Sequence, residues 1–181
     1  DHAGRDHQRV AELALDKDGR FLAVRLSGTG NAGAYIYPPM PATTNAVKNL
    51  IDVYKTPAME VNTQVVFTNT TPVAAYRGAG RPEGNYYMER LIDTAAREIG
   101  IDRVELRRRN HIAPTQMPYK APSGMNYDSG EFTAILDKAL AAADWNGFEV
   151  RKVESARRGK LRGRGIGSYL EVTGPPAKEY G

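Results

Sequence analysis

The sequence contains no cysteine and only three histidines in 181 residues. The absence of cysteine excludes a disulfide framework, a zinc ribbon, a thiolate-ligated iron–sulfur cluster and a cysteine nucleophile in this chain. With so few histidines, we expect no transition-metal site built from protein ligands alone. No apolar run approaches the ~20 residues of a membrane-spanning helix. The segment after Asp1 shows no signal-peptide pattern.

What is present is typical of one globular domain. The hydrophobic content is 41%, close to a globular average, and the length suits a single domain of ~100–200 residues. The net charge of +4 is mild and does not by itself indicate nucleic-acid binding. The chain begins without Met, so it could be a piece of a longer protein.

Hydrophobic periodicity predicts an α+β fold. Alternating apolar residues on both sides of the turn at residues 16–19 predict a β-hairpin over residues 7–27. Helical spacing predicts helices over residues 43–54, 81–100, 103–110 and 131–143, and alternation predicts strands over 60–69 and 163–173. The inward face of the helix over 131–143 would consist of Phe132, Ile135, Leu136, Ala139 and Leu140. Helices clustered beside a hairpin and isolated strands argue against a regular βαβ series.

The clearest predicted helix covers residues 81–100. Pro82 suits its first position and Gly100 its C-terminal stop. On the polar face, Asp93 and Arg97 are spaced for a surface ion pair. The apolar stripe on the other face consists of Met88, Leu91, Ile92, Ala95, Ala96 and Ile99. The next helix begins at Asp102, which resembles the cap residue of a capping box.

Several other motifs are better explained by ordinary structure. Residues 28–33 match the G-x-G-x-x-G dinucleotide pattern, but the residues that follow cannot start the helix that this site requires. We therefore expect a mobile glycine-rich loop. The basic runs 107–109 and 157–164 contain no aromatic residue. We interpret them as solvated faces, with phosphate or partner contact left open. The three histidines, His2, His7 and His111, lack a surrounding ligand cluster, which favours surface or capping roles.

The most informative segment is residues 71–83, Thr-Pro-Val-Ala-Ala-Tyr-Arg-Gly-Ala-Gly-Arg-Pro-Glu. A strand ends, a glycine-rich loop follows and a helix begins. Backbone N–H groups therefore gather beside a helix N-terminus, an arrangement that can hold an oxygen-rich anion. Arg77 and Arg81 add positive charge. The residues alone are equally compatible with a tight connection that carries two surface arginines.

This segment and several others together resemble the molybdenum-binding large subunit of the xanthine dehydrogenase/aldehyde oxidase family, and most closely the bacterial carbon monoxide dehydrogenase large chains. The resemblance rests on residues 75–83, 88–93 and 96–110, with support from 66–70, 117–119, 127–130 and 162–169. It implies that residues 1–181 form a single domain that is a middle piece of such a subunit. Residues 1–112 would end the first molybdopterin-binding subdomain, and residues 113–181 would form a linker and start the second.

The resemblance also implies cofactors and partners. Molybdopterin, in bacteria usually the cytosine dinucleotide form, would hold molybdenum between subdomains, where a carbon centre is hydroxylated with oxygen from water. The implied partners are the remainder of the large subunit, an FAD-binding medium subunit and a 2Fe–2S small subunit. The implied location is the bacterial cytoplasm, and any membrane association would run through those partners. No nucleic-acid binding is expected.

Carried over residue by residue, the resemblance places the loop against the molybdenum site. Arg77, Gly78 and Gly80 match cofactor-binding positions, and the backbone of Arg77 would approach the metal. Tyr76 and Ala79 match the substrate pocket. The family's pterin-binding glycine motifs and catalytic glutamate have no counterpart in this chain, so no complete catalytic set is present. We therefore expect the isolated chain to be inactive and free of cofactor, with Gly78, Ala79 and Gly80 on a solvent-exposed face.

One departure from the family bears on the substrate. Copper-dependent carbon monoxide dehydrogenases carry a cysteine where this chain has Gly78, and copper(I) needs a soft sulfur ligand. An aldehyde or an N-heterocycle is therefore favoured over CO. The favoured interpretation is that residues 74–83 form one wall of a molybdenum pocket. The alternative is a non-catalytic α+β domain that binds an anion or a partner through its basic surface runs.

Overall fold

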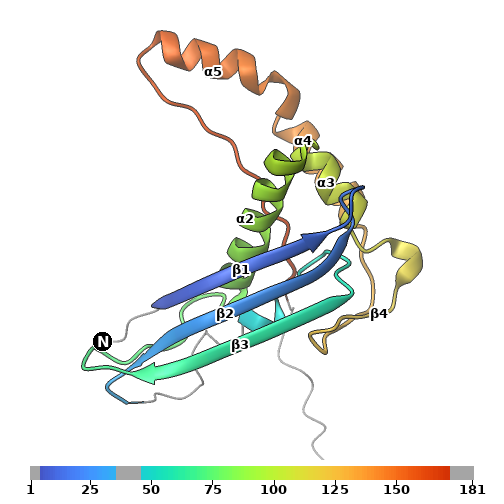
Figure 1. Ribbon diagram of the computed structural model, residues 1–181. Coiled ribbons are helices and arrows are strands. Elements are labelled where there is room, and N and C mark those ends of the chain that lie inside the picture. The colour runs from blue at the N-terminus through green and yellow to red at the C-terminus, as the bar shows by residue number, and fades with distance from the viewer. Residues whose placement is uncertain (1–4, 36–45, 172–181) are drawn as a thin grey trace, which may run out of the picture.

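A computed structural model describes residues 5–35 and 46–171 of the chain. Mixed strands and helices confirm the α+β fold class (Figure 1). The elements in chain order are β1 (His7–Leu15), β2 (Phe21–Gly33), β3 (Ala58–Phe67), α2 (Arg81–Ile99), α3 (Arg103–Asn110), the 3₁₀ helix η1 (Pro114–Gln116), β4 (Tyr119–Lys120), β5 (Asn126–Tyr127), α4 (Phe132–Ala142), the 3₁₀ helix η2 (Trp145–Gly147) and α5 (Phe148–Arg157). Of the helix predicted over 43–54, residues 43–45 lie outside the described part and residues 46–48 form a helical turn. The prediction is wrong over 49–54, where the chain forms turns and not a helix.

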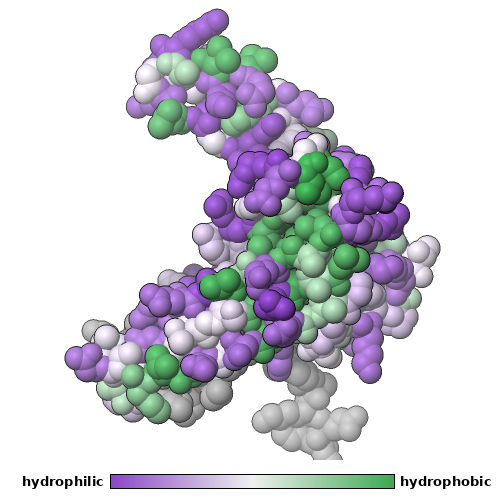
Figure 2. All heavy atoms as spheres, viewed as in Figure 1, coloured by the Kyte–Doolittle hydropathy of each residue, from purple (hydrophilic) through white to green (hydrophobic). Residues whose placement is uncertain are grey.

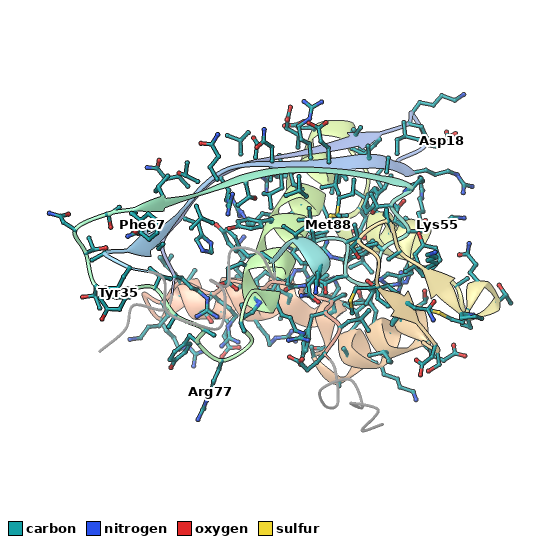
Figure 3. The ribbon with its side chains drawn as sticks, turned by 90° about the horizontal axis from the view of Figure 1, so that it is seen from below. Asp18, Tyr35, Lys55, Phe67, Arg77 and Met88 are labelled. Atoms are coloured by element: carbon teal, nitrogen blue, oxygen red, sulfur yellow. The ribbon has the colours of Figure 1, made fainter. Side chains whose placement is uncertain are left out.

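Three strands form the main sheet, in the order β1-β2-β3. β1 and β2 are antiparallel, which confirms the predicted hairpin, and β3 lies parallel to β2 with Val61 opposite Leu26. Figure 3 shows the sheet as one layer with the helices beneath it on a single face. Residues along β1 therefore alternate between half-buried and exposed.

The glycine-rich segment 28–33 is not the loop that the sequence predicted. It continues β2 to Gly33 and pairs with both neighbouring strands. A Cβ on Gly28 would lie 2.2 Å from the carbonyl oxygen of Gln8, so only glycine lets β1 approach this closely. A Cβ on Gly33 would meet the backbone of Pro72 at 2.4 Å. These glycines therefore serve close backbone packing.

The core lies between the inner face of the sheet and α2. Its fully buried side chains include Leu26, Leu50, Tyr54, Met88, Ile92 and Leu106. The predicted bounds of α2 are confirmed, with Pro at its start and Gly100 capping its end in the left-handed conformation. The predicted stripe is wrong at Ile99, which is 41% exposed because it is the last residue of the helix.

Two charged residues expected on solvated faces pair with each other instead: Arg107 is fully buried and Asp93 is half-buried. The Arg107 side chain has no exposed surface and pairs with Glu89 at 2.9 Å and with Asp93 at 2.9 Å. Asp93 therefore faces α3 and also pairs with Arg103, rather than with Arg97. Helical spacing could not predict this, because the partner belongs to another helix. The cap at Asp102 is confirmed: its side chain accepts the N–H groups of Val104 and Glu105.

The last third of the chain departs furthest from the sequence prediction. Only Phe132 and Leu136 of α4 are buried, whereas Ile135, expected to point inward, is 62% exposed. α5 was not predicted. Figure 1 shows it projecting from the body, and Figure 2 shows hydrophobic side chains among its hydrophilic ones. The strand predicted over 163–173 is absent up to residue 171, where the described part ends. Across residues 5–35 and 46–171 no helix has the length and apolarity needed to cross a membrane.

Candidate functional site

The candidate site is the loop of residues 76–80 that leads into α2. Its backbone turns tightly, since the Ala79 N–H donates to the Tyr76 carbonyl at 2.7 Å and the Arg81 N–H to the Gly78 carbonyl at 2.9 Å. Three consecutive residues have positive φ angles: +85° at Gly78, +39° at Ala79 and +101° at Gly80. Glycine adopts such angles without strain, which explains Gly78 and Gly80, while Ala79 is a non-glycine residue with a positive φ.

The segment before the loop fixes its position against the sheet. The Val73 N–H donates to the Ala32 carbonyl at 3.1 Å, and the Ala34 N–H donates to the Thr70 carbonyl at 3.0 Å. Val73 and Ala74 are buried. The loop therefore starts from the rigid end of β2, and α2 holds its other end.

The turn limits which backbone donors can reach a ligand. The N–H groups of Ala79 and Arg81 are already used inside the loop. The N–H groups of Gly78 and Gly80 have no hydrogen-bond partner within the described residues. Unpaired backbone N–H groups in a turn beside a helix N-terminus can bind an anionic oxygen.

The five residues predicted for the site lie together on this one turn. Tyr76 is 62% exposed, and Arg77 is exposed with its side chain directed away from the body (Figure 3). Gly78 and Ala79 are half-buried. The expectation that residues 78–80 form an open face is wrong at Gly80, which is buried under the start of α2.

A sixth residue, Arg5, was missed by the sequence analysis. Its Nη2 donates to the Arg77 carbonyl at 3.0 Å, and its Nε pairs with Glu83 at 2.7 Å. Its guanidinium also lies 5.5 Å from the ring centre of Tyr76. Only long-range contacts identify this residue, because it stands 72 positions before Arg77 in a segment without periodicity.

A hollow of about 490 Å³ adjoins the loop, lined by Arg5, Asp6, His7, Pro82, Glu83, Tyr86 and Tyr87. Its charged groups are Arg5, Asp6 and the buried carboxylate of Glu83. Burial lowers the pKa of His7, so this imidazole is neutral near pH 7. Among the described residues, no cluster of His, Asp and Glu side chains could hold a metal ion.

The loop fits an anionic cofactor that binds against backbone. A Cβ on Gly78 would lie 2.7 Å from the Pro82 ring, so this position keeps a bare backbone. The two free N–H groups and the exposed Arg77 form an electropositive edge without a carboxylate from the loop itself. A phosphate or another anionic group has the matching charge.

The other motifs predicted from the sequence have structural roles. His111 is the C-cap residue of α3, but it is buried and stacks on Tyr54 with 5.5 Å between ring centres. The run 107–109 is not a surface patch, because Arg107 is buried while Arg108 and Arg109 pair with Asp137 and Glu105. The run 157–164 stays largely exposed. The alternative, a domain that binds an anion or a partner through its basic runs, therefore depends on the run 157–164 alone. His2 lies outside the described residues.

Comparison with known proteins decides the family. The model of the molybdopterin cofactor-binding domain matches residues 1–111. The chain belongs to this family. It is 34% identical to the 6-hydroxypseudooxynicotine dehydrogenase complex subunit gamma of Paenarthrobacter nicotinovorans, over 89% of this chain and 20% of that protein. It is 33% identical to the carbon monoxide dehydrogenase large chain of Afipia carboxidovorans, over 94% of this chain and 22% of that protein.

Solved structures agree with this assignment to the cofactor-binding domain family. Quinoline 2-oxidoreductase from Pseudomonas putida 86 superposes with a TM-score of 0.76 at 33% identity, over 86% of this chain and 20% of that one. CO dehydrogenase from Oligotropha carboxidovorans superposes with a TM-score of 0.71 at 30% identity, over 87% of this chain and 20% of that one. The chain thus spans about one fifth of the length of these relatives.

Proposed function

We propose that residues 74–83 form one wall of a molybdenum–molybdopterin pocket in a molybdenum-dependent oxidoreductase. The observation that carries this proposal is the loop of three left-handed residues, in which the N–H groups of Gly78 and Gly80 have no partner among residues 5–35 and 46–171. The membership of the chain in the cofactor-binding domain family supports it.

In this proposal each loop residue has a distinct task. The N–H groups of Gly78 and Gly80 bind an anionic oxygen of the cofactor, and the backbone of Arg77 lies nearest the metal. Tyr76 and Ala79 border the substrate. When bound, the molybdenum cofactor supplies the oxidation of a carbon centre with oxygen taken from water. The chain's own residues position the cofactor and shape the space in front of it, and no complete catalytic set lies among them.

The loop also bears on the substrate class. Ala79 is small and half-buried, so it leaves room for an organic molecule such as an aldehyde or an N-heterocycle. Gly78 provides no thiolate for copper, so CO is the less favoured substrate. The names of two relatives, nicotine 6-hydroxylase large subunit and quinoline 2-oxidoreductase, support an N-heterocycle.

The remaining proposals concern the assembly. We infer that the chain works within a large subunit, with residues 1–112 ending one cofactor-binding subdomain and residues 113–181 starting the next. The match of the family model to residues 1–111 supports this division. We further propose the cytosine dinucleotide form of the cofactor, an FAD-binding medium subunit, a 2Fe–2S small subunit and a cytoplasmic location. Relatives named as subunits support such partners.

The direct test is the cofactor content of the complete large subunit that carries this chain. The proposal predicts one molybdenum atom per subunit and one equivalent of cytidine monophosphate released on acid hydrolysis. Iron and flavin would copurify when the partner subunits are present. A complete subunit without molybdenum, produced in cells that load a relative, would overturn the proposal.

A second test uses the isolated 181-residue chain and calorimetric titration with molybdopterin dinucleotide. One wall of a pocket cannot offset the freedom and hydration that so large a ligand loses on binding. We expect no binding at micromolar concentrations. Micromolar or tighter binding would show that this chain alone forms the site.

A further inference from the structure

An extended segment, residues 167–171, lies against α2 without joining a sheet. Its backbone is bound by side chains instead of a strand. The Ser168 N–H donates to Glu89 at 3.0 Å, and the Leu170 N–H donates to Asp52 at 3.3 Å. The amide of Asn85 donates to the Ser168 carbonyl at 2.7 Å. This pattern explains why the predicted strand has no sheet partner and yet is ordered.

The side chains that bind this segment are anchored in the core. Asp52 is 1% exposed and Glu89 is 7% exposed. Asn85 also donates to Asp52 at 3.1 Å, and the Tyr54 hydroxyl donates to Glu89 at 2.6 Å. Both carboxylates thus accept from the core on one side and from residues 167–171 on the other. Buried polar groups of this kind are costly to leave unpaired, so the contacts favour one position of the segment.

The same segment reaches the candidate site. Glu171 pairs with the Arg81 Nε at 2.9 Å. Arg81 is the first residue of α2, and its N–H closes the turn on the Gly78 carbonyl. A short path therefore runs from Asp52 and Asn85 through residues 168–171 to the loop that carries Gly78 and Gly80.

We propose that residues 167–171 act as a latch, which Asp52 and Asn85 hold closed and which positions the loop at residues 77–80 through Arg81. The role assigned to that loop rests on the proposed function. The latch itself is a property of the chain and does not depend on cofactor. Asp52, Asn85 and Glu171 are positioning residues for the site.

Amide hydrogen exchange on the 181-residue chain tests the latch. In Asn85→Ala the amides of Ser168 and Leu170 should exchange roughly tenfold faster or more, because a bridging hydrogen bond is lost. The amides of Ala79 and Arg81 should accelerate with them, while those of β2 keep the wild-type rate. Glu98→Ala is the matched control, since Glu98 lies exposed on the same helix, and it should change none of these amides.

A second variant isolates the link to the loop. Glu171→Gln removes the charge that pairs with Arg81 and leaves the side chains around Ser168 in place. We expect faster exchange at Ala79 and Arg81 and an unchanged rate at Ser168. Wild-type exchange at Ala79 and Arg81 in both variants would overturn the proposal, even if Ser168 accelerates in Asn85→Ala. If the amides of β2 also exchange faster in Asn85→Ala, that variant has loosened the whole fold, and the Glu171→Gln result alone tests the proposal.

This readout separates the latch from the proposed function. Exchange is measured without cofactor, so a chain whose complete subunit binds no molybdenum can still show the latch. Conversely, a molybdenum-loaded subunit whose loop exchanges independently of Asn85 would retain its function and refute the latch.

Discussion

The guanidinium of Arg5 donates to the carbonyl oxygen of Arg77 across 3.0 Å, which joins the start of the chain to the candidate site. The same group pairs with Glu83 and lies over the Tyr76 ring. Arg5 therefore holds the loop from one side, while Glu171 reaches it from the other through Arg81. The loop is kept in place by residues far from it in sequence.

Removing the Arg5 side chain should loosen the loop. In Arg5→Ala, trypsin should cleave after Arg77 several times faster than in wild type, because the carbonyl loses its anchor and the local opening becomes more frequent. Arg25→Ala is the control, since its ion pairs with Glu12 and Glu60 lie on the exposed face of the sheet. Equal cleavage after Arg77 in wild type and Arg5→Ala would show that Arg5 does not restrain the loop.

Truncating a buried isoleucine should lower the stability much more than truncating an exposed one. Ile92 is fully buried, so Ile92→Ala should lower the free energy of unfolding by about 2–5 kcal/mol. Ile135 is 62% exposed on α4, and Ile135→Ala should change it by less than about 0.5 kcal/mol. Urea denaturation followed by circular dichroism measures both. Similar losses would mean that α4 is buried as the sequence predicted.

The ion pair of the half-buried Asp93 with Arg107 changes what removal of the Asp93 side chain should cost. A surface Asp would contribute almost nothing, but Asp93 binds the fully buried Arg107. Asp93→Ala should therefore cost about 1–3 kcal/mol, with Glu89 still holding the guanidinium. The exposed Glu98→Ala on the same helix is the control. A loss below about 0.5 kcal/mol in urea denaturation would place Asp93 on a solvated face after all.

Two buried groups, Asp52 and His111, should change the free energy of unfolding in opposite directions over nearly the same pH range. Burial raises the pKa of Asp52 to about 7, so the folded state binds the proton more tightly than the unfolded state does. The contribution of Asp52 to the free energy of unfolding is therefore lost as pH rises from about 4 to 7. Burial, with Arg107 and Arg108 nearby, lowers the pKa of His111 to about 4. The contribution of His111 is therefore lost as pH falls from about 6.5 to 4.

Variants separate the two terms. Asp52 is faced by Glu89 and Arg81 of α2 and by Tyr127 of β5, and His111 is faced by Asp137 of α4 in addition to the two arginines. In Asp52→Asn the His111 term remains, so relative to wild type the unfolding free energy should rise more steeply between pH 4 and 6.5. In His111→Gln it should rise less steeply or fall. Identical pH profiles for both variants would contradict these assignments.

Local patterns predicted the elements whose partners are near in sequence. The hairpin, the cap at Asp102 and the bounds of α2 follow from turn residues and periodicity, and the structure confirms them. Three of the wrong predictions share one cause. The strand pairing of residues 28–33, the burial of Arg107 and the docking of residues 167–171 all depend on distant partners.

The candidate site divides in the same way. The turn at Gly78–Gly80 could be predicted, because glycines before a Pro-Glu helix start restrict the backbone strongly. Its anchoring could not, since the ion pairs of Arg5 with Glu83 and of Glu171 with Arg81 join residues far apart in the sequence. The assignment to a molybdenum pocket came from the resemblance of whole segments, and no single charge or spacing would have given it.

The most direct measurement of the central claim is the turnover of the complete, molybdenum-loaded enzyme with Arg77→Ala. Arg77 is exposed and has no core contact through its side chain (Figure 3), so the variant should fold and load molybdenum normally. Loss of one positioned electrostatic group should lower kcat by about 10²–10³-fold. Arg90→Ala, an exposed arginine further along α2, should leave kcat unchanged. Wild-type turnover in Arg77→Ala at equal molybdenum content would contradict the placement of this loop at the molybdenum site.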